Sequence, residues 1–153
     1  MHQKNKLILI LELLWLAIIA VLIFAFVMPL QDFVSQRFLL INSLLIFLFV
    51  QYARLLVALR ISFLSELYYP KIILFFSLFI LFFVVMKQFS IYIGPLKDQT
   101  LFPFNLNIPY GTYERIFREW LFFGTGCLIL TPLLILRLYL SIIKQKLLRG
   151  LRK

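Results

Sequence analysis

The fold is decided by the first long apolar stretch of the chain, Leu7–Met28, which reads LILILELLWLAIIAVLIFAFVM and contains a single charged residue, Glu12. A helix that crosses the hydrocarbon core of a bilayer needs about 20 predominantly apolar residues. Pro29 follows the stretch directly, and proline is poorly tolerated inside a helix. The stretch is too long for the core of a signal peptide, so we expect it to remain as a membrane-spanning helix.

Three further apolar stretches have the same character, and together the four predict spans at about 7–29, 38–59, 70–88 and 120–140. The composition agrees, because 63% of the 153 residues are hydrophobic and only 14% are charged. A soluble domain is about half apolar and about a quarter charged. The sequence therefore predicts one membrane domain covering 1–153, an all-α integral membrane protein with four transmembrane helices.

Basic residues are distributed unevenly over the connections between these stretches. The 16 Lys and Arg outnumber the 6 Asp and Glu, giving a formal charge of +10. The excess lies at the N-terminal tip, in the second connection and in the C-terminal segment. Because cytoplasmic segments carry more Lys and Arg, both termini are predicted to be cytoplasmic. We expect the cytoplasmic (inner) membrane of a bacterium, with an organelle inner membrane as the alternative. No basic segment is long enough for a nucleic-acid docking domain.

The segment before the last span, about 89–119, is predicted to be an ordered extracytoplasmic loop. Prolines interrupt it, but it keeps too many apolar residues for a disordered linker. From Thr112, as N-cap, a charged helical turn is expected to lead into the fourth span. Two pairs of opposite charge follow at i,i+4 spacing: Glu114 with Arg118, and Arg115 with Glu119.

Glu12 is the most unusual residue within the predicted spans. It lies about 9 Å inside the first span at 1.5 Å per residue, and Arg54 lies at a similar depth in the second. A carboxylate inside a membrane costs several kcal/mol unless it is paired, hydrated or protonated. Our first interpretation is a structural intramembrane charge pair, Glu12–Arg54, between antiparallel helices. The alternatives are a proton- or cation-coupled site and a shallow carboxylate that reaches the interface.

The fourth predicted span contains small and helix-bending residues. Gly124 and Gly126 permit close approach of a neighbouring helix, and Thr131 can cap carbonyls that Pro132 leaves without a donor. We interpret these residues as a kinked packing face. A discontinuous-helix binding site is the alternative, although no matching partner segment is evident.

The C-terminal tail, 141–153, alternates apolar and basic residues. It is expected to be an amphipathic cytoplasmic continuation of the fourth span at the membrane surface, held by anionic lipid at about 1 kcal/mol per basic residue. A topology signal without a partner is the alternative. The candidate headgroup ligands are Lys144, Lys146, Arg149, Arg152 and Lys153.

Catalysis, a metal site and a cofactor are not expected. His2 is the only histidine and lies at a terminus, which is usually frayed, so we do not expect a His-dependent triad. Cys127 is the only cysteine, so a thiolate cage is excluded by count. We expect a non-enzymatic subunit, accessory protein or scaffold of a larger membrane complex, with other membrane subunits or copies of itself as partners. The first alternative is a small proton- or cation-coupled transporter or channel-forming homo-oligomer that uses Glu12. The second is a membrane-perturbing, holin-like effector.

Overall fold

The computed structural model describes residues 2–58, 68–97 and 110–150. The elements in chain order are α1 (His2–Val27), the short 3₁₀ helix η1 (Met28–Leu30), α2 (Gln36–Ala58), α3 (Tyr68–Lys97) and α4 (Tyr110–Gly150). The described part of the chain is helical apart from the turn between η1 and α2. The predicted all-α fold is therefore confirmed.

The turn from α1 into α2 follows from Pro29 and Ser35. Pro29 lies within η1, and the tightened chain closes with a hydrogen bond from the Gln31 amide to the Met28 carbonyl (3.3 Å). Ser35 then caps α2, because its hydroxyl oxygen accepts a hydrogen bond from the Phe38 amide at 3.4 Å. This local chemistry reverses the chain within a few residues and makes α1 and α2 antiparallel neighbours.

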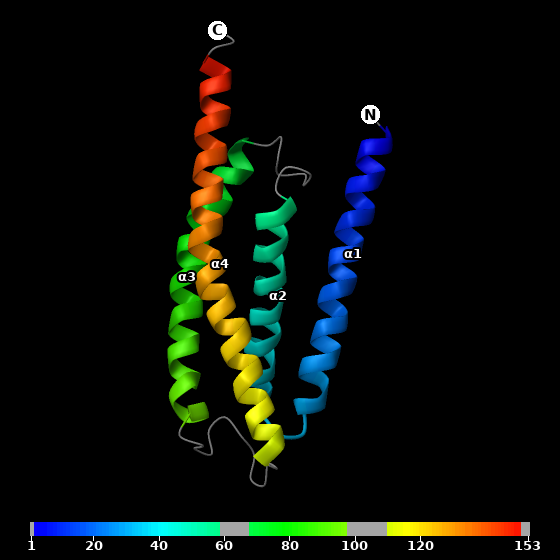
Figure 1. Cartoon of the computed structure of the whole chain (residues 1–153), viewed down its shortest axis with the longest axis vertical. Coiled ribbons are helices and arrows are strands. Elements are labelled where there is room, and N and C mark those ends of the chain that lie inside the picture. The colour runs from blue at the N-terminus through cyan, green and yellow to red at the C-terminus, as the bar shows by residue number, and fades with distance from the viewer. Residues whose placement is uncertain (1, 59–67, 98–109, 151–153) are drawn as a thin grey trace.

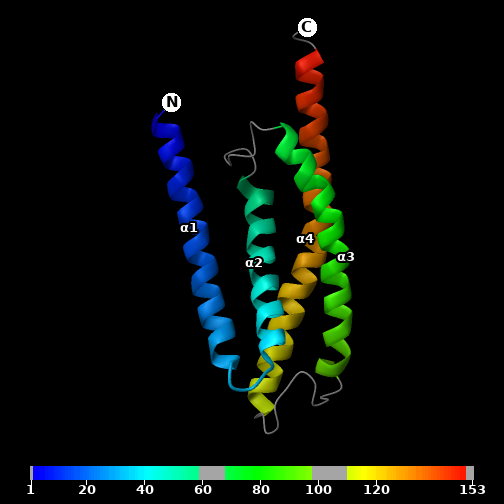
Figure 2. The ribbon, with the colours of Figure 1, turned by 180° about the vertical axis from the view of Figure 1, so that it is seen from behind.

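The four helices run alternately up and down, so both termini lie at the same end of the molecule (Figure 1). We call this end the terminal end, and the opposite one, where α1 turns into α2, the turn end. α1 packs against α2, α2 against α4, and α4 against α3. The view from behind shows the same order, with α1 at one edge and α3 at the other (Figure 2).

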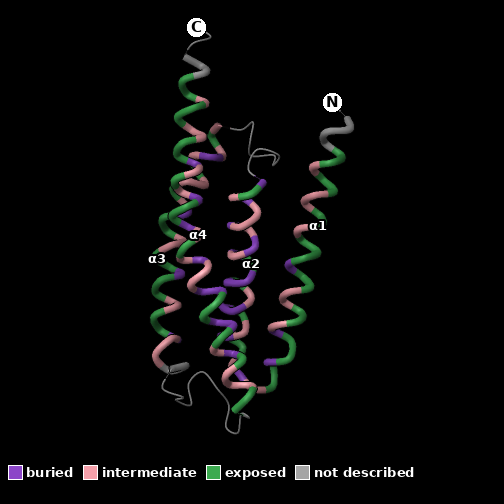
Figure 3. The backbone as a smooth tube through the Cα atoms, in the orientation of Figure 1, coloured by how far each residue is buried: buried purple, intermediate pink, exposed green. Residues whose placement is uncertain are grey.

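All four long helices are apolar and long enough to cross a membrane. The segments that qualify are Lys6–Leu30, Gln36–Ala58, Tyr68–Gly94 and Tyr110–Leu147. The helices differ greatly in burial. In the most apolar 18-residue segment of α2, 39% of the residues are buried inside the molecule, whereas in that of α1 only 6% are. Buried residues accordingly concentrate where α2 meets α4, and α1 is exposed along most of its length (Figure 3).

The packed core of the turn end is aromatic. Phe38 of α2 stacks on Trp120 of α4 with ring centroids 5.0 Å apart, and Tyr92 of α3 meets Trp120 edge-on at 5.3 Å. All three side chains are almost completely buried. Such contacts add about 0.5–1.5 kcal/mol per pair beyond the burial of apolar area, so this cluster joins three helices firmly.

The helices extend further than the predicted spans. α3 continues to Lys97 and α4 begins at Tyr110, so the predicted loop 89–119 is helical over 89–97 and 110–119. Its remaining part lies outside the described residues. Thr112 is inside the first turn of α4 and is not its N-cap. The physical reason for the longer α3 is that Tyr92 belongs to the aromatic core, which holds the helix beyond the apolar run.

Candidate functional site

Glu12 and Arg54 form an ion pair between α1 and α2. Arg54 Nη2 lies 2.5 Å from Glu12 Oε1, and Arg54 Nη1 donates a hydrogen bond to Gln51 Oε1 at 2.8 Å. The side chain of Arg54 is 14% exposed and that of Glu12 is 29% exposed, so most of the surface of the pair is buried. The structure thus brings together the two residues that sequence reasoning placed at matching depth.

The pair lies toward the terminal end of the molecule. At 1.5 Å per residue, Glu12 lies about 15 Å along α1 from His2, and Arg54 about 6 Å before the end of α2 at Ala58. Both partners sit on apolar helices, where a lone charge would be costly. Removing one partner of such a pair leaves the other uncompensated, so the pair ties α1 to α2.

At the turn end, α1 is held by different contacts. Phe26 meets Phe123 of α4 edge-on at 5.5 Å, and Arg115 Nη2 of α4 donates a hydrogen bond to the Ala25 carbonyl at 3.1 Å. Val27 and Leu30 are buried beside them. Sequence reasoning missed the bond from Arg115 to Ala25, because no local signal pairs an arginine with a distant backbone carbonyl.

The face of α1 that points away from α2 is apolar and uncovered. We call it the α1 outer face and define it by large side chains that keep more than half of their exposure. Between its attachments at the two ends, α1 therefore offers a continuous apolar surface to its surroundings. The members are Leu7, Leu9, Ile10, Leu13, Leu14, Leu16, Val21 and Phe24.

The charged turn at the start of α4 contains both predicted i,i+4 pairs. Arg118 pairs with Glu114, and Arg115 Nε lies 2.7 Å from Glu119 Oε1. The two pairs differ in burial, because Glu119 is buried and Glu114 is partly exposed. Among the described residues, the second oxygen of Glu119 has no hydrogen-bond partner. The predicted pairs are therefore present, and one of them reaches into the core.

The two glycines of α4 receive phenylalanines from two different helices. A Cβ atom on Gly124 would clash with the Phe89 ring of α3, and a Cβ on Gly126 would lie 2.5 Å from the Phe49 ring of α2. These glycines therefore let α4 approach both neighbours, as small residues do in membrane helices. Sequence reasoning identified the glycines as packing residues but could not identify the rings that fill the space.

The hydrogen bond of Thr131 differs from the capping role that the sequence analysis assigned to it. Pro132 lacks the amide that would bond to the Leu128 carbonyl, four residues earlier. The Thr131 hydroxyl donates instead to the Cys127 carbonyl at 2.6 Å, so it does not cap the carbonyl that the proline frees. α4 nevertheless continues through Pro132 and changes direction along its length (Figure 1).

The predicted basic tail is a direct continuation of α4. The helix runs to Gly150, because no glycine or proline interrupts it between Pro132 and that residue. Lys144 and Lys146 are exposed near its end, and Arg149 lies in its last turn. Arg152 and Lys153 lie outside the described residues.

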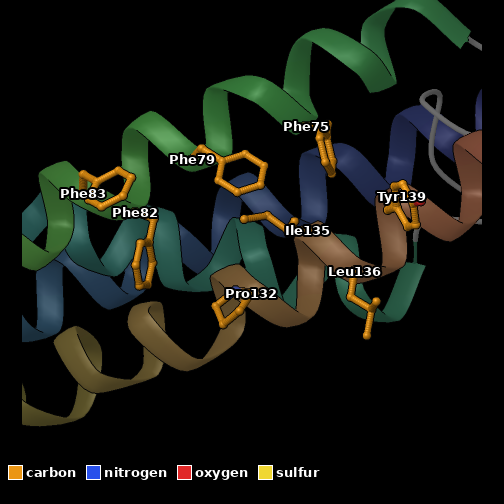
Figure 4. A pocket seen from close by; sticks show the side chains of 8 residues that line it. All are labelled: Phe75, Phe79, Phe82, Phe83, Pro132, Ile135, Leu136 and Tyr139. Atoms are coloured by element: carbon orange, nitrogen blue, oxygen red, sulfur yellow. The ribbon is translucent and has the colours of Figure 1, made fainter.

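A groove between α3 and α4 was not anticipated from the sequence. We call it the α3–α4 groove; its volume is about 400 Å³, within the range of small-molecule sites. Its lining is apolar and is made of side chains from both helices (Figure 4). The lining residues are Phe75, Phe79, Phe82 and Phe83 of α3, and Pro132, Ile135, Leu136 and Tyr139 of α4.

Within the described residues, no group of three or more His, Cys, Asp or Glu side chains could hold a metal ion. Comparison of the chain with protein-family models, curated proteins and solved structures found no match. Function must therefore be inferred from the geometry of this chain alone.

Proposed function

We propose that this chain is a four-span integral membrane protein that serves as a non-enzymatic subunit, accessory protein or scaffold of a larger membrane complex. The proposed location is the cytoplasmic membrane of a bacterium, with both termini in the cytoplasm. Two features support this topology. Both termini lie at one end of the molecule, and that end carries Lys6, Lys71, Lys144 and Lys146.

The single observation that supports the subunit role is the α1 outer face. Only 6% of the most apolar segment of α1 is buried inside the molecule. Among the long helices, α1 packs mainly against α2. Membrane helices associate through close packing and interhelical hydrogen bonds. The ion pair and the turn-end contacts fix the position of α1 while its outer side stays available to a partner helix.

Site-specific photo-crosslinking in the native membrane tests this role. A photoreactive residue replaces Leu13 or Val21 on the α1 outer face, and Phe83 on α3 serves as a matched control at the opposite edge. We expect Leu13 and Val21 to crosslink one reproducible membrane protein in stoichiometric amounts, and Phe83 not to crosslink it.

Two other results would contradict the subunit role. Crosslinks to lipid alone would mean that the α1 outer face simply contacts the bilayer. Crosslinks only to a second copy of the chain would favour a homo-oligomer. That result would direct attention to transport in proteoliposomes, with Glu12→Gln as the variant that abolishes it.

A further inference from the structure

The second half of α4 has a narrow stripe of exposed apolar side chains along one side. These residues follow one another at alternating steps of four and three, the heptad spacing of helices that pack side by side. Their exposed fractions range from 37% to 64%. We call this stripe the α4 seam. Its members are Ile129, Leu133, Leu136, Leu140, Ile143 and Leu147.

The α4 seam lies opposite the side through which α4 joins the other helices. The buried residues of the same stretch are Cys127, Thr131, Leu134 and Leu138. At 100° per residue, their mean direction lies about 170° around the helix from that of the seam. Leu136 also borders the α3–α4 groove. The seam as a whole therefore points away from the buried core and is available to a further helix.

The α4 seam continues beyond the apolar part of the molecule. α4 has 41 residues and is about 60 Å long at 1.5 Å per residue, twice the thickness of a hydrocarbon core. At the terminal end it extends past the other three long helices (Figure 1). The apolar segments end near the level where Lys71 of α3 donates a hydrogen bond to Gln145 of α4 at 3.0 Å. Leu147 lies beyond that level and is 64% exposed.

Lys144 and Lys146 flank the α4 seam at this end, and both are exposed. Measured from the line midway between Ile143 and Leu147, the two lysines lie about 80° to either side at 100° per residue. In the heptad they occupy the two positions beside the apolar line, where charged residues determine the choice of partner. The seam is therefore bordered by positive charge on both sides.

Acidic residues of the described helices lie elsewhere. α2 and α3 contain no Asp or Glu, and the acids of α4, Glu114 and Glu119, lie near its opposite end. Glu12 of α1 lies toward the terminal end but is paired with Arg54. A partner with acidic residues beside an apolar line would complement the seam in both shape and charge.

We propose that the α4 seam binds a helix of another membrane protein, with apolar residues at the same spacing and Asp or Glu at its cytoplasmic end. This inference rests on the proposed subunit role and defines the chemistry of the partner at a second surface. Within the bilayer, the seam supplies close packing. Beyond it, Ile143 and Leu147 are removed from water while the acidic residues pair with Lys144 and Lys146.

Other occupants match the α4 seam less well. A symmetric pair of parallel α4 helices would bring Lys144 and Lys146 of both copies together at one level, and like charges across an interface are unfavourable. An anionic lipid headgroup can pair with the lysines, but it does not cover Leu147 beyond the apolar segments. An acidic helix satisfies both the charge and the exposed apolar residues.

Photo-crosslinking in the native membrane, followed by mass spectrometry of the crosslinked peptide, tests the proposal. A photoreactive residue replaces Leu140 or Leu147 on the seam, and Ile73 of α3, which is 70% exposed, serves as the control. We expect both seam positions to crosslink one helix of the same membrane protein, with Asp or Glu toward its cytoplasmic end. Ile73 should not crosslink that helix.

Charge reversal then tests the pairing itself. With the photoreactive residue at Leu140, Lys146→Glu should lower the crosslinking yield about five-fold, because acidic residues then face each other. Lys87→Glu makes the same change at an exposed lysine near the other end of α3 and should leave the yield unchanged. Replacing the partner's acidic residue by Lys should restore the yield with Lys146→Glu, which a misfolded chain would not show.

Several results would overturn the proposal. Crosslinks from the seam to lipid alone, to a second copy of the chain or to a helix without acidic residues would each contradict it. Equal yields in Lys146→Glu and Lys87→Glu would do the same. If the α1 outer face captures a partner protein and the seam captures none, this inference alone fails. If neither surface captures a partner, the subunit role fails as well.

Discussion

The two ends of the molecule are held together in different ways. At the turn end, Phe38, Tyr92 and Trp120 join α2, α3 and α4 through buried aromatic contacts. At the terminal end, α1 is tied to α2 by the ion pair of Glu12 and Arg54. The aromatic core is stabilised by many weak contacts, so one substitution removes only a part of them. The attachment of α1 at the terminal end depends on two side chains, so one substitution removes it. The difference indicates that α1 is the element whose position can be changed with the fewest substitutions.

The largest effect should come from the turn end. Trp120→Ala removes a completely buried ring that touches two other helices, so we expect a loss of about 3–5 kcal/mol in the free energy of unfolding. Thermal unfolding in detergent, followed by circular dichroism, measures it. Phe24→Ala is the control, because Phe24 is 68% exposed on α1 and should change stability little. Similar losses in both variants would contradict a core centred on Trp120.

The ion pair should have an intermediate effect that a double substitution reverses. Arg54→Met leaves the Glu12 carboxylate unpaired, and we expect a loss of about 1–3 kcal/mol, between the values for exposed and fully buried pairs. Arg54→Met combined with Glu12→Leu removes both charges and should return stability close to the original. A double-mutant cycle measures the coupling. Additive losses would show that the two side chains do not act as a pair.

Two glycines of α4, Gly126 and Gly111, differ in how closely another helix approaches them. Gly126→Ala places a methyl group against the Phe49 ring, and we expect a loss of about 1–2 kcal/mol because the ring must shift. Within the described part of the chain, a methyl group on Gly111 would meet no packed neighbour within 4 Å, so Gly111→Ala should instead raise stability by up to about 1 kcal/mol. In thermal unfolding, we expect the melting temperature to fall in Gly126→Ala and to rise in Gly111→Ala. A change in the same direction in both variants would contradict the close approach of α2 and α4 at Gly126.

The smallest effect should come from the exposed pair of Arg118 and Glu114. Glu114→Gln should lower stability by less than about 0.5 kcal/mol, because exposed i,i+4 pairs contribute little. The matched substitution Glu119→Gln, at a buried position, should change stability more. Comparison of the two melting temperatures measures the difference, and a larger effect at Glu114 would contradict the burial of Glu119.

Local properties of the sequence predicted the helices but not their packing. The apolar runs are long enough to identify each helix without knowing its neighbours, and the Glu12–Arg54 contact followed from depth in antiparallel helices. The continuation of α3 to Lys97 depends on Tyr92 reaching Phe38 and Trp120, which are distant in sequence. No periodicity in a single segment contains that information.

The same reason explains what was missed at the candidate sites. The α3–α4 groove is lined by residues of two helices, so the phenylalanines of α3 alone could not indicate it. The hydroxyl of Thr131 had two carbonyls within reach, and the sequence could not show that it bonds Cys127. The glycine positions were evident, but their partners Phe89 and Phe49 lie on other helices.

Distance measurements by electron paramagnetic resonance test most directly whether the ion pair holds α1 at the terminal end. In a Cys127→Ala background, one pair of spin labels replaces Leu7 and Val57, and a second pair replaces Phe24 and Leu40, all at exposed positions. Introducing Arg54→Met should lengthen and broaden the distance between the labels at 7 and 57. The distance between those at 24 and 40 should stay unchanged. An unchanged distance between 7 and 57 would contradict the role of the ion pair in positioning α1.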